Sequence, residues 1–114
     1  MTTPDSAPEF VRILEAIDKL IHEPGRLMIV ALLYIVESAD FVFIMRQTGM
    51  TKGNLSAHLS KLEAGGYLSV NKQFIHKIPR TFLSLTPAGR QAFESYQQKI
   101  QQFWRDMPAR DESH

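Results

Sequence analysis

The stretch TKGNLSAHLSKLEAGG, residues 51–66, decides the fold of this chain. Thr51 is a favoured helix N-cap residue, and the closing glycine pair is typical of a helix C-terminus, so the sequence predicts one helix between them. Leu55, Leu59 and Leu62 recur at helical spacing. We expect these three leucines to pack inward.

The opposite side of this helix carries small, polar or basic side chains. A helix that enters the major groove of DNA needs small residues for close approach, hydrogen-bonding groups for base edges and cations for phosphates. A solvated helix face is the alternative interpretation. His58 lies near the leucine face and is expected to pack there. The candidate DNA-reading residues are Thr51, Lys52, Gly53, Asn54, Ser56, Ala57, Ser60 and Lys61.

Three further helices are predicted before this one. The segment FVFIMRQ, residues 41–47, follows a capping Asp40 and ends at Gly49, so it forms a helix-turn-helix with residues 51–66. RLMIVALLYIVE, residues 26–37, is too long and continuous for a strand and predicts a buried central helix. The first helix is expected over residues 6–21, with a capping box of Ser6 and Glu9, and residues 22–25 break it.

A β-hairpin and a last helix are predicted after residue 66. Apolar and polar residues alternate over 68–74 and again over 80–85, with a loop near residues 75–79. Thr86 and Pro87 then begin a long helix that reaches about Met107. The expected order is therefore α-α-α-α-β-β-α, mainly helical with a small hairpin. Four basic side chains crowd the hairpin, and we expect them to contact DNA, with a merely solvated hairpin as the alternative. These residues are Lys72, His76, Lys77 and Arg80.

Length and charge indicate one domain with a positive centre. The chain has 114 residues and a net charge of only +1. Residues 45–90 nevertheless hold seven Lys or Arg and a single acid, Glu63, between two acidic flanks. This distribution favours a polyanion partner, with chance clustering as the alternative. We treat residues 1–114 as a single domain with four parts. These are an N-terminal helix over 6–21, a central helix-turn-helix and hairpin over 25–86, a C-terminal helix over 87–107 and a frayed tail over 108–114.

The two terminal helices predict a homodimer. Each carries a long apolar stripe at helical spacing, more than one small core requires. A two-fold interface built from both would set two recognition helices about 34 Å apart, one turn of DNA. The alternative is that both stripes close the core of a monomer. The predicted interface residues are Phe10, Ile13, Ile17, Leu20, Phe93, Tyr96, Ile100, Phe103, Trp104 and Met107.

Two motifs carry a family resemblance. The chain has GNLSAHLSKLE at residues 53–63, followed by Gly66-Tyr67, and then KQF at 72–74, PRT at 79–81 and LTPAGRQAF at 85–93. In this order it resembles bacterial and archaeal winged helix-turn-helix regulators of the MarR and ArsR kind. The resemblance implies a dimer that binds specific duplex DNA, with Lys77 and Arg80 on the wing. The residues that it places against the major groove are Thr51, Lys52, Asn54, Ser56, Ala57 and Lys61. The wing tip departs from the pattern, since it has no glycine and two exposed apolar residues.

Other functions find little support in the sequence. The chain has no cysteine, its histidines are scattered, and no catalytic motif occurs, so we expect no metal, no cofactor and no enzyme activity. No signal peptide or membrane-spanning stretch is present, which predicts a cytoplasmic protein. We expect a transcriptional repressor; a winged-helix module that binds only protein is the alternative. Core packing is favoured over a small-molecule effector pocket for Met28, Tyr34, Phe41, Phe43 and Met45.

Overall fold

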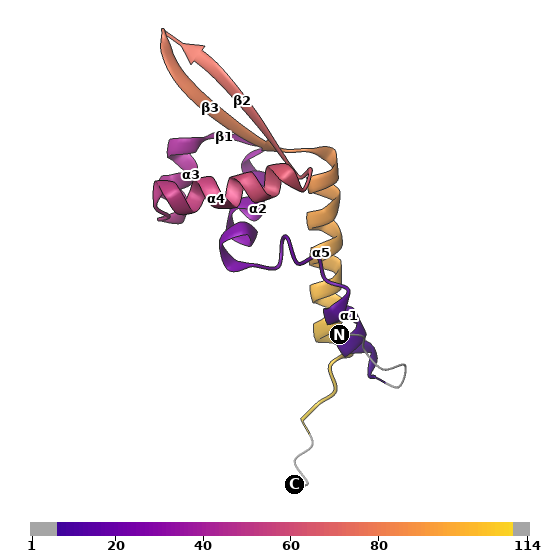
Figure 1. Cartoon of the computed structure of the whole chain (residues 1–114). Helices are drawn as coiled ribbons and strands as arrows, with labels where there is room; N and C mark the ends of the chain where they lie inside the picture. Colours follow the sequence, from indigo (N-terminus) through magenta and orange to yellow (C-terminus); the bar gives the residue numbers. More distant parts are fainter. Residues whose placement is uncertain (1–6, 111–114) are drawn as a thin grey trace.

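A computed structural model describes residues 7–110 of the chain. Five helices and three strands follow one another, and the middle three helices form a bundle beneath a long hairpin (Figure 1). The mainly helical architecture with a hairpin wing is therefore confirmed. The elements are α1 (Glu9–Glu15), α2 (Pro24–Val36), β1 (Ser38–Asp40), α3 (Phe41–Thr48), α4 (Lys52–Ala64), β2 (Leu68–Ile75), β3 (Ile78–Leu85) and α5 (Pro87–Asp106).

The helix-turn-helix forms as the sequence predicts. Asp40 caps α3 by accepting a hydrogen bond from the backbone N–H of Phe43 at 2.7 Å. Gly49 ends α3 in the left-handed conformation, with φ of 71°, which glycine adopts without steric cost. The Thr51 hydroxyl then accepts the N–H of Asn54 at 3.1 Å and begins α4. These local signals fix the turn between α3 and α4.

The core lies between α2, α4, the sheet and the near half of α5. Apolar side chains from all of these elements meet there with almost no exposed surface, which provides the main driving force for folding. Within the described residues, no polar or charged residue is buried. The largest fully buried side chains are those of Ile21, Ile29, Val30, Leu33, Ile44, Leu55, Leu62 and Leu83.

The first helix is shorter than predicted. Ser6 lies outside the described residues, Pro8 is the N-cap, and α1 ends at Glu15 although the apolar spacing continued to Ile21. Asp18 explains the early end, because its carboxylate accepts the N–H of Leu20 at 2.9 Å and so competes with helical hydrogen bonding. Ile17 and Ile21 still reach the core, but from an irregular segment.

The second helix begins earlier than predicted. Pro24 and Gly25, expected to separate two helices, form its first turn, where proline loses no hydrogen bond. Glu23 is the N-cap, and its carboxylate accepts the N–H groups of Gly25 at 3.0 Å and Arg26 at 2.7 Å. The break between α1 and α2 therefore covers residues 16–23.

The sheet contains one strand that the sequence analysis missed. The strand order is β1-β3-β2, all antiparallel, with Ala39 of β1 opposite Leu83 of β3. The hairpin is also longer than predicted, since a two-residue turn at His76 and Lys77 replaces the expected loop over 75–79. Both turn residues have positive φ, 52° and 66°, as a two-residue type I′ turn requires.

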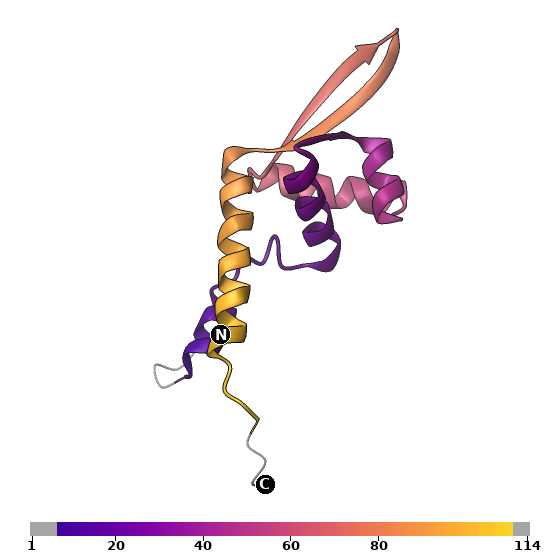
Figure 2. The ribbon, with the colours of Figure 1, turned by 180° about the vertical axis from the view of Figure 1, so that it is seen from behind.

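The last helix leaves the sheet in the direction opposite to the hairpin. It begins at the Thr86 cap, as predicted, and α1 lies beside its far half (Figures 1 and 2). The rings of Phe10 and Phe103 meet edge to face there, with centroids 6.0 Å apart. The hairpin and the α1–α5 pair therefore project from opposite ends of the bundle.

Candidate nucleic-acid interface

Helix α4 divides into a buried face and an exposed face. Leu55, Leu59 and Leu62 are buried, as their spacing predicts. The eight residues proposed from the sequence as a DNA-reading surface are all exposed. Because four of these, at positions 53, 56, 57 and 60, have short or no side chains, a ligand can approach the helix backbone closely.

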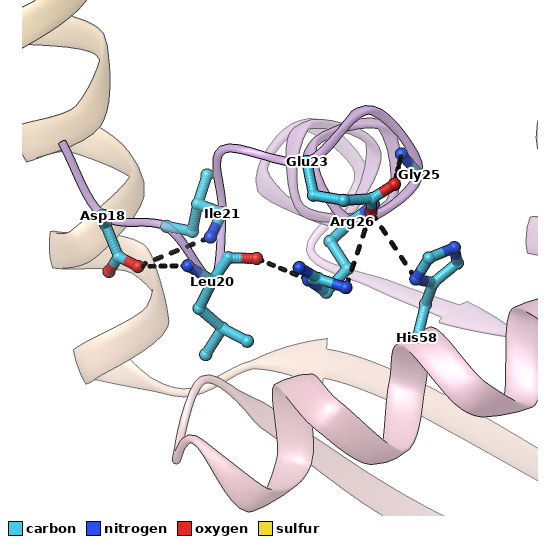
Figure 3. Close-up of polar contacts among 7 residues, drawn as sticks. All are labelled: Asp18, Leu20, Ile21, Glu23, Gly25, Arg26 and His58. Carbon is cyan, nitrogen blue, oxygen red and sulfur yellow. Dashed lines mark hydrogen bonds and ion pairs between the residues drawn. The ribbon is translucent and has the colours of Figure 1, made fainter. Parts of the chain in front are cut away.

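His58 and Glu23 hold α4 against the start of α2 (Figure 3). A Cβ atom added to Gly25 would lie 2.5 Å from Nε2 of His58, so the imidazole occupies the space that glycine leaves. His58 Nδ1 lies 3.6 Å from Oε2 of Glu23. The imidazole therefore packs within the protein, which confirms the expectation from the sequence.

The same carboxylate organises the surrounding backbone. Hydrogen bonding from the N–H of Arg26 is the largest cause that lowers the pKa of Glu23, and the N–H of Gly25 and the charges of His58 and Arg26 act in the same direction against partial burial. The Nε of Arg26 in turn donates to the carbonyl of Leu20 at 2.7 Å (Figure 3). This cluster fixes the orientation of α4 relative to α2.

The hairpin contributes a second exposed basic surface. Lys72, His76 and Lys77 are exposed, whereas Arg80 makes an ion pair with Asp40. Its Nη1 donates to Oδ2 of Asp40 at 2.9 Å, although the Arg80 side chain remains 47% exposed. The sequence pattern indicates a helix cap at Asp40 but gives no sign of this ion pair.

An open groove separates α3 and the start of α4 from the hairpin. Its volume is about 780 Å³, and its lining includes Phe41, Arg46, Lys52, Ser56, Ile78 and Arg80. Asp40 is the one acid among the lining residues, and it is already paired with Arg80. Arg46 was not among the residues proposed from the sequence, although it lies in the basic segment 45–90. The groove thus joins the two basic surfaces into one.

A helix-turn-helix followed by a basic hairpin defines the winged helix-turn-helix class. The chain belongs to the family of winged helix DNA-binding domains, whose family model matches residues 26–104. An uncharacterized protein of Methanocaldococcus jannaschii, MJ0432, is 36% identical over 84 residues, which are 74% of this chain and 91% of that protein.

Solved structures of transcriptional regulators share this fold. A transcriptional regulator homologue from Pyrococcus horikoshii OT3 superposes with a TM-score of 0.76 at 26% identity, covering 85% of this chain and 94% of that one. A MarR-family protein from Enterococcus faecalis V583 gives a TM-score of 0.69 at 18% identity, over 91% of this chain and 93% of that one. The resemblance to MarR-like regulators noted in the sequence is confirmed.

The residues proposed for a dimer interface fall into three groups. Ile13, Ile17, Phe93 and Tyr96 are buried within one chain, and their burial there needs no partner. Phe10, Leu20, Ile100 and Phe103 are half-buried. Trp104 is 65% exposed, and Met107 and the neighbouring Leu14 are also exposed. The apolar surface left open to solvent at this end of the molecule is therefore narrower than the sequence stripes suggested.

The aromatic and Met residues considered for an effector pocket do not share one cavity. Tyr34 donates to Oε2 of Glu94 at 2.8 Å and packs on Phe93, while Phe41, Phe43 and Met45 pack against the core. Phe41 and Phe43 also line the groove beside the hairpin. Among residues 7–110, no helix combines the length and apolar character needed to cross a bilayer.

Proposed function

We propose that this protein is a sequence-specific transcriptional regulator that binds duplex DNA. The observation that carries the proposal is the continuous basic surface formed by α4, the groove and the hairpin. No Asp or Glu occurs between Glu63 and Glu94, so the hairpin and the start of α5 carry no negative side chain. A surface of this kind neutralises phosphates, which supply much of the affinity of DNA-binding proteins.

Helix α4 would read bases in the major groove. Asn54 and Ser56 offer hydrogen-bonding groups on the exposed face, and Gly53 and Ala57 leave room for base edges. Lys52 and Lys61 at the two ends of that face would contact phosphates on either side of the groove. In support, AbfR, a structure of the same fold solved bound to DNA, superposes with a TM-score of 0.66 at 18% identity, covering 82% of this chain and 65% of that one.

The regulator would act as a cytoplasmic homodimer without enzyme activity. Trp104, Met107 and Leu14 leave an apolar area at the α1–α5 end of the molecule, far from the DNA-reading surface. A two-fold axis at that end would present two copies of α4 to one face of a palindromic site. Repression follows if such a site overlaps a promoter and the bound dimer excludes polymerase.

Lysine-rich surfaces argue against the alternative of a protein-binding module, because the cores of protein interfaces are depleted in lysine. An effector remains a secondary proposal. NadR, solved in complex with 4-hydroxyphenylacetate, has the same fold with a TM-score of 0.63 at 20% identity, over 92% of this chain and 82% of that one. In this chain the groove beside Phe41 and Phe43 is the candidate position for a small aromatic ligand.

The test is selection of duplexes from a random pool, followed by fluorescence anisotropy of the selected duplex across a salt series. We expect binding that falls steeply with salt and is lost in the double variant Lys52→Glu/Lys61→Glu. The matched control is Lys19→Glu/Arg110→Glu, which changes net charge equally at exposed positions outside α4 and the hairpin. A folded wild-type protein that binds no duplex at low salt would refute the proposal.

A further inference from the structure

The tip of the hairpin is apolar on both of its faces. Phe74 lies directly opposite Pro79, and Ile75 lies directly opposite Ile78, next to the turn. Because successive side chains of a strand point to opposite faces, the first pair occupies one face and the second pair the other. All four residues are exposed, Phe74 by 78% and Ile78 by 57%. These exposed apolar side chains lie at the tip of the hairpin, which projects from one end of the molecule (Figure 1).

Each apolar pair has a cationic side chain on the same face of the hairpin. Lys72 is two residues before Phe74 and therefore shares its face, whereas Arg80 is two residues after Ile78 and shares the other face. Lys77 lies in the turn itself. The hairpin tip is consequently an apolar edge with a positive charge on each side.

This arrangement matches the chemistry of one DNA surface. The minor groove lies between two rows of phosphates, and architectural proteins that bind there insert Phe, Ile or Pro between the stacked faces of neighbouring base pairs. An apolar edge with one cation on each face places hydrophobic groups at the base steps and charges at the two phosphate rows. The absence of acids from residues 64–93 favours this polyanion over a protein partner.

We infer that the wing tip is a wedge that enters the minor groove, partly unstacks one base step with Phe74 and Ile78, and bends the duplex. The inference rests on the proposed DNA-binding function and adds a deformation of the DNA to it. Pyrimidine–purine steps such as TA and CA unstack at the lowest cost, so they should be preferred where the wing contacts the site. This preference would arise without any hydrogen bond to a base.

Arg80 can contact a phosphate beside the wedge while it keeps its ion pair with Asp40. Only Nη1 of its guanidinium donates to Asp40, and a guanidinium has five N–H donors in total. The remaining donors are available to a phosphate while Nη1 keeps its bond to Asp40, because the side chain is 47% exposed. The same contact therefore orients the cation on the Ile78 face.

The experiment uses a duplex selected by the full chain, labelled at both ends for energy transfer and carrying 2-aminopurine at the step facing the wing. We expect wild-type protein to shorten the end-to-end distance and to raise 2-aminopurine fluorescence. The variant Phe74→Ser/Ile78→Ser should bind the same duplex with an unchanged salt dependence, because no charge is altered, but with both signals lost. Phe74→Leu should retain them, and Gln73→Ser is the control for a polar change on the wing.

The outcomes separate this inference from the proposed function. Duplex binding by the wild type without bending or unstacking would overturn the wedge alone. Equal signals from wild type and the double serine variant would also overturn it, as would a change in oligomeric state as the sole effect of that variant. Failure of the wild type to bind any duplex would overturn both proposals together. Circular dichroism checks that each variant is folded, which is expected because these side chains lie outside the core.

Discussion

One carboxylate, that of Asp40, serves both α3 and the wing. Its Oδ2 accepts Nη1 of Arg80 at 2.9 Å, while its Oδ1 accepts the backbone N–H of Phe43 at 2.7 Å. Asp40 also ends β1, which pairs with β3 of the hairpin. A single residue therefore connects the first helix of the helix-turn-helix to the base of the wing.

Substituting this residue separates its two roles. Asp40→Asn keeps a capping oxygen but loses the ion pair, and the free energy of unfolding should fall by less than about 1 kcal/mol, as for other partly exposed pairs. Asp40→Ala loses the cap as well and should cost about 1 kcal/mol more. Urea unfolding of the two variants measures the difference. Equal stability of both would contradict a capping role.

The same pair of variants should strengthen DNA binding. Asp40→Asn removes the one acid that lines the groove and frees Arg80, so nonspecific duplex affinity at low salt should rise severalfold. Anisotropy titration against mixed-sequence duplex measures this change. Weaker binding would contradict this prediction, because it would show that the orientation of Arg80 by Asp40 contributes more to affinity than the Asp40 charge costs.

Gly25 and His58 should show strong energetic coupling. Gly25→Ala places a methyl group against the imidazole and forces α4 or the ring to move, which should cost about 1–3 kcal/mol of unfolding free energy. Adding His58→Ala creates space, so the double variant should be destabilised by less than the two single variants together. A double-mutant cycle by chemical denaturation tests this. Strict additivity would show that the two side chains do not meet.

Low pH should destabilise the folded protein by protonating Glu23. Its pKa is lowered in the folded state below the ordinary value of 4.5, chiefly by the N–H of Arg26. The resulting stability is therefore fully present above pH 4.5 and is lost as pH falls through the lowered folded pKa. Glu23→Gln should flatten this part of the stability profile, measured by urea unfolding at several pH values. A profile unchanged by the substitution would assign the acid sensitivity to other carboxylates.

High pH should destabilise the folded protein by deprotonating Tyr67. The phenol donates a hydrogen bond to Asp18, and this contact raises the pKa of Tyr67 from 10.0 to about 12. Its contribution is present below pH 10 and is lost as pH rises through about 12. The pKa values of Tyr34 and Tyr96 are also raised, so spectrophotometric titration of the phenols should show three tyrosines above the ordinary range, the last of which is missing in Tyr67→Phe. That variant should also lose about 1 kcal/mol of stability at neutral pH.

Trp104 should report on dimer formation directly. It is the single tryptophan of the chain and is 65% exposed. If the α1–α5 end forms the two-fold interface, its emission should shift to shorter wavelength as protein concentration rises, and Trp104→Ala should sediment as a folded monomer. A monomeric wild type at high concentration, with emission independent of concentration, would exclude this interface.

The local parts of the fold followed from the sequence, and the non-local parts did not. The caps at Asp40, Thr51 and Thr86 and the two faces of α4 depend on residues within a few positions of one another, so periodicity and capping rules predicted them. Strand β1 has only three residues, too few for an alternating pattern to be recognised, and it exists because β3 is available to pair with it. The sequence alone does not indicate this strand pairing, so it could not predict the contact between Arg80 and Asp40, which are 40 residues apart.

The errors at α1 and at the wing tip have different causes. Apolar spacing continued through Asp18, but its carboxylate accepts the N–H groups of Leu20 and Ile21, which a continuing helix would have bonded to backbone carbonyls. At the wing tip, turn rules expect Asn or Gly at positive φ, so His76 and Lys77 did not indicate a two-residue turn. The apolar pairs beside this turn became recognisable as pairs only once the register was known.

The junction at Thr86 joins the wing to α5 without any intervening loop. Thr86 alone separates β3 from α5; its N–H donates to the carbonyl of Tyr67 at 3.0 Å, and its hydroxyl donates to the carbonyl of Gly66 at 2.6 Å. The same hydroxyl accepts the N–H of Gly89 at 3.0 Å. These hydrogen bonds fix the angle between β3 and α5 at a single residue. A change in that angle therefore requires at least one of them to break.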